Sequence, residues 1–220
     1  MNTINPFSRP LYVMLKPVGA ACNLRCHYCY YLEKACFYKD SSKRVLSEEM
    51  LDQFTKEYIE AQTMNDVLFT WHGGEPLMRP LSFYRKALEL QKKYGRGRNI
   101  SNVIQTNGTL LTDEWCRFLH ENNWLVGVSI DGPQEFHDEY RRTASGGPSW
   151  AKVMRGIQLL NKHHVEWNAM AVVNDFNADY PLDFYHFFKE MGCRFIQITP
   201  VVERMVNHAD GRHLATLTDD

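Results

Sequence analysis

Three closely spaced cysteines are the residues of this chain with the clearest chemistry. Cys22, Cys26 and Cys29 follow a C-x3-C-x2-C spacing just after a strand-like run, and Tyr28 precedes the last of them. Three thiols at this spacing suit three corners of an iron–sulfur cubane and leave one iron without a protein ligand. An open coordination position distinguishes catalytic from structural metal sites, a rule stated for zinc that we extend by analogy. The motif therefore predicts a catalytic metal cluster.

A structural zinc site is the alternative interpretation of the same motif. Cytosolic cysteine clusters often bind zinc, and His27 or Cys36 would supply a fourth ligand. Zinc sites usually contain two short-spaced ligand pairs, however, and no second C-x2-C pair follows in this sequence. The ferredoxin pattern C-x2-C-x2-C-x3-C-P differs as well. The spacing favours iron–sulfur over zinc and leaves both open.

Composition bounds the class of protein and its partners. With 220 residues, 44% of them hydrophobic and 23% charged, the chain can form one substantial core. A net charge of −1 gives no electrostatic case for nucleic acid or an anionic membrane as a partner. No apolar run approaches the roughly 20 residues of a membrane helix, and the N-terminus lacks the apolar core of a signal peptide. Because three of the six cysteines crowd into one loop, we expect a reducing cytoplasm rather than disulfides.

Strand-like and helix-like segments alternate along the chain and must position the cysteine loop. The expected strands are 11–18, 66–71, 101–106, 125–130, 165–173 and 195–199. The expected helices are 47–62, 81–94, 113–122, 149–163 and 181–191. Several strands are near-continuous apolar runs, as in parallel sheets covered on both faces. Repeated right-handed βαβ units follow, in either an open doubly wound sheet or a barrel-like curved sheet.

The chemically interesting residues fall where these strands end. Ligands of parallel α/β sheets gather at the carboxyl ends of the strands. Five signals are expected on this one rim: the cysteine loop, Gly73-Gly74-Glu75-Pro76, Thr106-Asn107-Gly108, Ser129-Ile130-Asp131-Gly132 and Pro200-Val201-Val202. They predict a single shared site.

Taken together, the motifs resemble those of the radical S-adenosylmethionine (radical SAM) superfamily. The matching residues are Cys22-x3-Cys26-x-Tyr28-Cys29, Gly73-Gly74-Glu75-Pro76 and Ser129-x-Asp131-Gly132. The resemblance implies a partial (β/α)6 TIM-like barrel over about residues 10–205. It also implies a [4Fe-4S] cluster on the three cysteines, whose unique iron chelates SAM. One-electron cleavage of SAM then yields a 5′-deoxyadenosyl radical that takes a hydrogen atom from the substrate, while the protein supplies position and exclusion of water.

The same resemblance implies the residues that contact SAM. Gly73 and Gly74 would let the backbone approach its methionine amino group, and Glu75 would offer an acceptor nearby. Tyr28 and Val202 would contact the adenine. Ser129 and Arg141 would contact the methionine or ribose end.

Each of these residues also has a purely structural interpretation. A Gly-Gly pair is usually a turn, and Ser129-x-Asp131-Gly132 could be a strand-ending Asx turn. On local evidence, Arg141 and Arg142 are solvated, and His72 and His163-His164 are structural or exposed. Cys116 and Cys193 are expected to be small, buried hydrophobic residues. Cys36 is not assigned as a ligand.

Within the superfamily, the detail is similar to the anaerobic sulfatase-maturating enzymes. The motifs that carry this likeness are Lys16-Pro17-x4-Cys22-Asn23-Leu24-x-Cys26-x-Tyr28-Cys29-Tyr30-Tyr31-Leu32, Trp71-His72-Gly73-Gly74-Glu75-Pro76, Gln105-Thr106-Asn107-Gly108 and His137-Asp138-x-Tyr140-Arg141. Such enzymes oxidise a Cys or Ser of a sulfatase to formylglycine. The resemblance implies a sulfatase polypeptide as substrate and flavodoxin or ferredoxin as electron donor.

One departure from that family limits the prediction. The family continues into a C-terminal cysteine-rich domain with two auxiliary [4Fe-4S] clusters and an aspartate base, and only Cys36, Cys116 and Cys193 remain here. We therefore expect a radical SAM core at 1–205, a polar tail at 206–220 that marks a truncation point, an incomplete and inactive fragment as one possibility, and no general base within this chain. Another radical SAM peptide maturase and a zinc-stabilised, non-catalytic domain are the alternatives.

Overall fold

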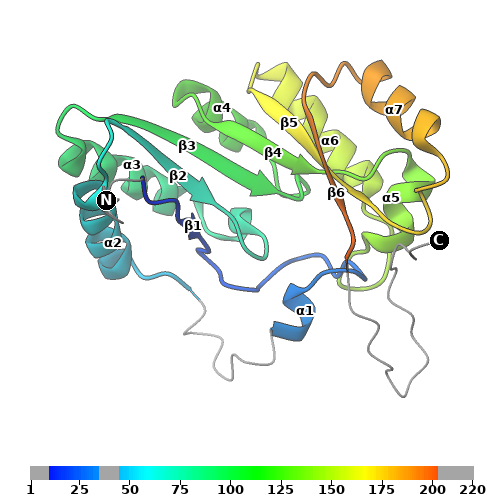
Figure 1. Ribbon diagram of the computed structural model, residues 1–220, viewed down its shortest axis with the longest axis horizontal. Coiled ribbons are helices and arrows are strands. Elements are labelled where there is room, and N and C mark those ends of the chain that lie inside the picture. The colour runs from blue at the N-terminus through cyan, green and yellow to red at the C-terminus, as the bar shows by residue number, and fades with distance from the viewer. Residues whose placement is uncertain (1–9, 35–44, 203–220) are drawn as a thin grey trace, which may run out of the picture.

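A computed structural model describes residues 10–34 and 45–202 (Figure 1). Its centre is one six-stranded parallel sheet in the order β1-β2-β3-β4-β5-β6. The strands are β1 Met14–Leu15, β2 Asp66–Trp71, β3 Asn99–Thr106, β4 Leu125–Ser129, β5 Trp167–Val173 and β6 Ile196–Pro200. The register places Met14 beside Thr70, Val103 beside Leu125, and Val173 beside Pro200.

The strand order decides between the two predicted layouts. A doubly wound sheet reverses its strand order at one point, whereas here every strand pairs with its neighbour in the sequence. Right-handed crossovers that always advance in one direction put all their helices on one side of the sheet. Figure 1 shows the long helices gathered on one side of a curved sheet. The fold is therefore the partial, TIM-like (β/α)6 barrel.

Helices and strands mostly have the predicted bounds. The helices are α1 Tyr31–Lys34, α2 Glu48–Ala61, α3 Leu81–Gly95, α4 Asp113–Glu121, α5 Gln134–Tyr140, α6 Trp150–Lys162 and α7 Pro181–Glu190, with a 3-10 turn, η4, at Pro76–Met78. Ser47 and Thr112 are side-chain N-caps, which accept from the N–H groups of Met50 and Trp115. The short elements α1, η4 and α5 lack the apolar stripe of a longer helix and were not predicted.

The predicted strand 11–18 is wrong for most of its length. Only Met14–Leu15 pairs with β2. The backbone of Leu11 is instead bonded to side chains of α2 and its C-cap, since its N–H donates to Gln62 and its carbonyl accepts from Gln62 and Tyr58. Beyond the strand, Pro17 has no N–H to give to a ladder. The chain therefore leaves the sheet early and turns into the cysteine loop.

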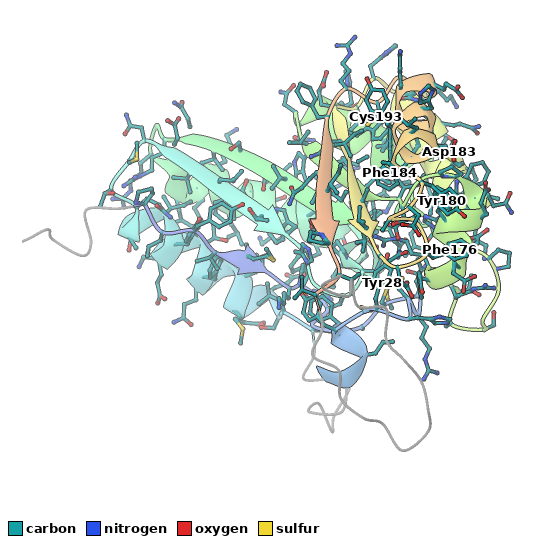
Figure 2. All side chains as sticks on the ribbon, turned by 45° about the vertical axis from the view of Figure 1, so that its right-hand side comes forward. Tyr28, Phe176, Tyr180, Asp183, Phe184 and Cys193 are labelled. Carbon is teal, nitrogen blue, oxygen red and sulfur yellow. The ribbon has the colours of Figure 1, made fainter. Side chains whose placement is uncertain are left out.

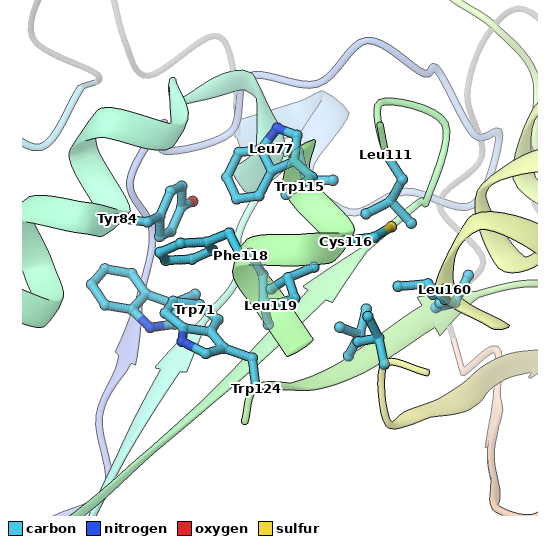
Figure 3. Packing of buried hydrophobic residues seen from close by; sticks show 14 of the residues in the cluster. Trp71, Leu77, Tyr84, Leu111, Trp115, Cys116, Phe118, Leu119, Trp124 and Leu160 are labelled. Atoms are coloured by element: carbon cyan, nitrogen blue, oxygen red, sulfur yellow. The ribbon is translucent and has the colours of Figure 1, made fainter. Parts of the chain in front are cut away.

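The core lies between the sheet and its helices and is rich in aromatic rings (Figure 3). Trp71 stacks on Trp124 with ring centroids 6.0 Å apart, and Tyr84 meets both rings edge-on. The Trp71 indole N–H donates to Asn102 at 2.9 Å, so its burial leaves no unpaired donor. This packing fixes β2, β3 and β4, whose carboxyl ends carry the predicted site.

Two further predictions are settled by burial. Cys116 is fully buried in the core, as predicted, whereas Cys193 is only partly buried against it.

None of the helices in the described part of the chain is long and apolar enough to span a membrane.

Candidate active site

A cavity of ≈ 510 Å³ opens at the carboxyl ends of the strands. All five predicted rim signals contribute to its wall, because parallel strands bring their carboxyl ends to one edge. The lining includes Cys22, Cys26, Cys29, Gly74, Thr106, Asn107, Ser129, Pro200, Val201 and Val202. Figure 2 shows Tyr28, another lining residue, close to the tip of β6. The volume lies within the range of small-molecule sites.

The three thiols lie on a loop whose backbone is bonded to residues 140–142 on both sides of Cys26. Arg25 N–H donates to the Arg142 carbonyl at 2.7 Å, and His27 N–H donates to the Tyr140 carbonyl at 2.9 Å. Each thiol is free and half-buried, and each lines the cavity. Three sulfurs therefore converge on one space and leave its opposite side to other residues.

Without a bound metal, burial favours the neutral form of two of these thiols. It raises the pKa of Cys22 to about 12 and that of Cys26 to about 11, although Arg141 pulls the Cys26 value down. Bound iron would reverse this balance, because a metal's positive charge favours thiolates. The free, convergent thiols and the open cavity beside them fit a [4Fe-4S] cluster with SAM next to it.

The zinc interpretation requires all of its ligands to reach one ion. Among residues 10–34 and 45–202, no group of three or more His, Cys, Asp or Glu side chains, the three cysteines included, is placed in this way. His27 is exposed, with its ring 6.1 Å from that of Tyr140, and is not part of the cavity wall. Cys36 lies outside the described residues.

The glycine pair after β2 serves the cysteine loop. Gly73 and Gly74 have φ of +79° and +46°, and a Cβ on Gly74 would lie 1.9 Å from the Ala21 carbonyl oxygen. A Cβ on Gly73 would lie 2.4 Å from Lys16 Cγ. Gly74 lines the cavity, whereas Gly73 is outside the lining. The two glycines therefore let the β2 loop pack directly on the chain that leads to Cys22.

Glu75 is not among the residues that line the cavity, and its expected contact with SAM stays a prediction. The carboxylate is fully buried and accepts from Leu77 N–H at 2.9 Å, Thr106 Oγ1 at 2.7 Å and Asn107 N–H at 2.7 Å. Burial raises its pKa to about 7, against the lowering effect of these donors. Glu75 is thus a brace between the β2 and β3 loops.

Asp131 holds Arg141 and Tyr28 beside the cysteine loop and was not among the predicted site residues. It is fully buried and accepts from Arg141 Nε at 2.8 Å, Arg141 Nη2 at 3.0 Å and Val172 N–H at 2.9 Å. The Tyr28 hydroxyl also donates to it. Its signal in the sequence was the Ser129-x-Asp131-Gly132 motif, where an Asx turn was the competing interpretation.

Arg141 is a buried cavity residue, so its solvated interpretation is wrong. Its exposed fraction is 8%, its guanidinium lies 5.4 Å from the Tyr28 ring centroid, and both residues line the cavity. The adjacent Asp131 raises its pKa further above the ordinary value, although burial acts in the opposite direction. The charge of Arg141 is paired with Asp131, and its contact with SAM stays a prediction.

The remaining predicted contacts also lie on the cavity wall. Ser129 ends β4 and is 9% exposed, while Val202 follows β6 and is 85% exposed. Their contacts with SAM stay predictions. Met170, Ala171 and Val172 of β5 add an apolar stretch between them.

His72 belongs to the lining, although sequence reasoning placed it in a structural or exposed role. It is partly buried, and burial lowers its pKa despite a hydrogen bond with Gln105, which also lines the cavity. The neutral imidazole is therefore favoured. Its position directly before Gly73 was the available signal.

Comparisons with known proteins agree with this geometry. Residues 17–188 match the family described as the radical SAM superfamily. A serine-type anaerobic sulfatase-maturating enzyme of Bacteroides thetaiotaomicron is 72% identical over 99% of this chain and 53% of the relative. A cysteine-type enzyme of Clostridium perfringens is 35% identical over 86% of this chain and 51% of the relative.

A solved structure agrees as well. The one described as "Native anSMEcpe with bound AdoMet and Cp18Cys peptide" superposes with a TM-score of 0.83 at 32% identity, over 95% of this chain and 55% of that one. The chain spans about half the length of the curated relatives it matches. With the match to the family covering most of its length, the chain belongs to the radical SAM superfamily.

Proposed function

We propose that this chain is the SAM- and cluster-binding core of an anaerobic sulfatase-maturating enzyme that oxidises a serine of its target to formylglycine. The observation that carries this is one cavity shared by three free thiols and the loops after β2, β3, β4 and β6. Serine is proposed because the 72% identical relative is serine-type, whereas the cysteine-type relative is 35% identical.

Cys22, Cys26 and Cys29 would hold the [4Fe-4S] cluster, and SAM would fill the cavity beside it. When bound, this pair supplies one-electron reductive cleavage of SAM and hence the hydrogen-abstracting species. Arg141 would contact the carboxylate of SAM, and Tyr28, Val172 and Val202 would contact its adenine ring, since all four residues line the cavity.

The chain's own residues keep this cavity in shape. Glu75 braces the β2 and β3 loops, and Asp131 fixes Arg141 and Tyr28 beside the cysteine loop. The half-buried lining excludes bulk water from one side, which protects a reactive species from quenching. Oxidation of serine to an aldehyde removes two electrons and two protons, and we assign no base for the hydroxyl proton to the described residues.

The remaining partners follow from this chemistry. A single low-potential electron per SAM requires a small redox protein, and flavodoxin or ferredoxin is the proposed donor. Thiolate ligands require a reducing compartment, so the proposed location is the cytoplasm. The substrate is a sulfatase polypeptide that would reach the open mouth of the cavity.

Anaerobic turnover tests the proposal. Protein reconstituted with iron and sulfide is incubated with SAM, dithionite and a sulfatase peptide carrying serine or cysteine at the target position. We expect 5′-deoxyadenosine and loss of two hydrogens from the serine peptide. A Cys26→Ala variant should form neither product, whereas Cys116→Ala, in the core, should form both.

The possible outcomes distinguish SAM cleavage from oxidation of the peptide. Iron-loaded protein that forms no 5′-deoxyadenosine contradicts the radical SAM assignment of the site. Protein that cleaves SAM but leaves both peptides unchanged contradicts peptide oxidation by this chain alone, for which no general base is assigned. Colourless, zinc-loaded protein contradicts both.

A further inference from the structure

Asn107, which follows β3, contacts the sulfur of Cys22 through its side-chain amide. Its Nδ2 lies 3.7 Å from Cys22 Sγ and donates to Asn23 Oδ1 at 2.9 Å. The backbone N–H of Leu24 lies 3.3 Å from the same sulfur. Sequence reasoning placed Asn107 on the rim without giving it a role.

The orientation of this amide is fixed by its neighbours. Asn107 Oδ1 accepts from the backbone N–H of Thr109 at 3.0 Å and from Thr109 Oγ1 at 2.7 Å. A backbone N–H can only donate, so the oxygen of the amide must face Thr109 and its NH2 group must face Cys22. Asn23 Nδ2 closes the ring by donating to Thr109 Oγ1 at 2.8 Å. The donor at the sulfur is therefore determined by the network.

The loop that carries Asn107 is itself held rigidly. Its backbone N–H donates to the buried carboxylate of Glu75 at 2.7 Å, and Asn107 is 7% exposed. On the outer side, Arg155 donates to the carbonyls of Thr109 and Leu111 at 2.9 and 3.3 Å. The amide thus keeps its position when a group is bound in the cavity.

We propose that Asn107 is a positioning residue that raises the reduction potential of the cluster by donating to the sulfur of Cys22. The inference rests on the proposed cluster. Adding one electron to an iron–sulfur cluster increases the negative charge on its thiolate ligands, and hydrogen bonds to those sulfurs stabilise the reduced form. Loss of the donor makes reduction less favourable. We expect about a tenfold fall in the ratio of reduced to oxidised cluster at a fixed potential, which is about 59 mV for a one-electron couple.

Three variants test this assignment. Asn107→Leu removes the donor at similar volume, and Asn107→Asp keeps the acceptor for Thr109 but turns a negative oxygen toward Cys22. Thr109→Val is the matched control, because it breaks the same ring of side chains without touching the sulfur. Anaerobic redox titration followed by EPR gives the midpoint potential, and the signal of this cluster is identified by its change on adding SAM.

We expect both Asn107 variants to lower the potential, with Asn107→Asp lowering it more, and Thr109→Val to leave it near wild type. An Asn107→Leu potential equal to wild type, or an equal shift in Thr109→Val, overturns the proposal. So does failure of both Asn107 variants to take up iron when Thr109→Val does, because Asn107 would then be only structural. The potential is read without peptide or turnover, so sulfatase maturation can fail while this inference holds.

Discussion

Neutralising Asp131 is the sharpest test of how Arg141 and Tyr28 are held in the cavity wall. Its carboxylate is fully buried and accepts from two nitrogens of Arg141, from Val172 N–H and from the Tyr28 hydroxyl. Asp131→Asn keeps the shape of the side chain but leaves the buried guanidinium without its counter-charge.

The size of the effect follows from the geometry. Removing one partner of a buried ion pair costs about 3–5 kcal/mol of unfolding free energy. Asn can keep its oxygen at the position that accepts from Arg141 Nη2 and Val172, so about 3 kcal/mol is expected. This is a large fraction of the roughly 5–15 kcal/mol of a typical domain. Adding Arg141→Met removes the stranded charge, so the double variant should regain much of the loss.

Urea unfolding of the reduced protein under anaerobic conditions measures these free energies by linear extrapolation. Asp113→Asn is the matched control, because Asp113 pairs with Lys162 on the exposed surface and should lose much less. The reasoning is refuted if Asp131→Asn costs no more than this control. It is equally refuted if the losses of Asp131→Asn and Arg141→Met simply add in the double variant.

Three more substitutions probe the loops around the cysteines. Gly74→Ala should lower stability by at least about 1–2 kcal/mol and reduce iron uptake, because its φ is +46° and the new Cβ would lie 1.9 Å from the Ala21 carbonyl oxygen. Gly156→Ala should cost about 1–3 kcal/mol in urea unfolding, since its Cβ would lie 2.2 Å from the Gly108 oxygen and push α6 off the β3 loop. For Glu75, whose pKa rises from 4.5 to about 7, the unfolded chain loses its proton first. The stability of wild type relative to Glu75→Gln should therefore fall as pH rises from 4.5 to 7, by about 3 kcal/mol at roughly 1.4 kcal/mol per unit.

Each of these has its own control. Gly97→Ala has a φ of +83° but open space around its Cβ, so it isolates backbone strain from the clash at Gly74. Equal losses at both positions would contradict the close approach to Ala21. Unfolding of Gly156→Ala indistinguishable from wild type would mean that α6 can shift freely. A pH profile of Glu75→Gln parallel to that of wild type would show that the pKa of Glu75 is not raised in the folded protein.

Most of the architecture could be predicted from the sequence alone. Apolar runs and amphipathic stripes placed five of the six strands and all five long helices within two residues, because these periodicities reflect which faces are buried. The handedness of βαβ units then predicted that the cysteine loop and four other signals share one rim, and the cavity lies at this rim. The failure at 11–18 came from side chains of α2 that replace a strand partner, which no local pattern reports.

What the tertiary structure decided is the direction and partnership of each polar side chain. The sequence shows that Glu75, Asn107 and Asp131 sit after strands, but not that Glu75 turns inward or that Asn107 faces a sulfur. Those choices depend on donors far away in the chain, such as Thr106 for Glu75 and Val172 for Asp131. A buried polar group must be matched by whichever partner the fold brings to it. Spacing therefore determines which residues reach the site, and three-dimensional packing determines what each of them does there.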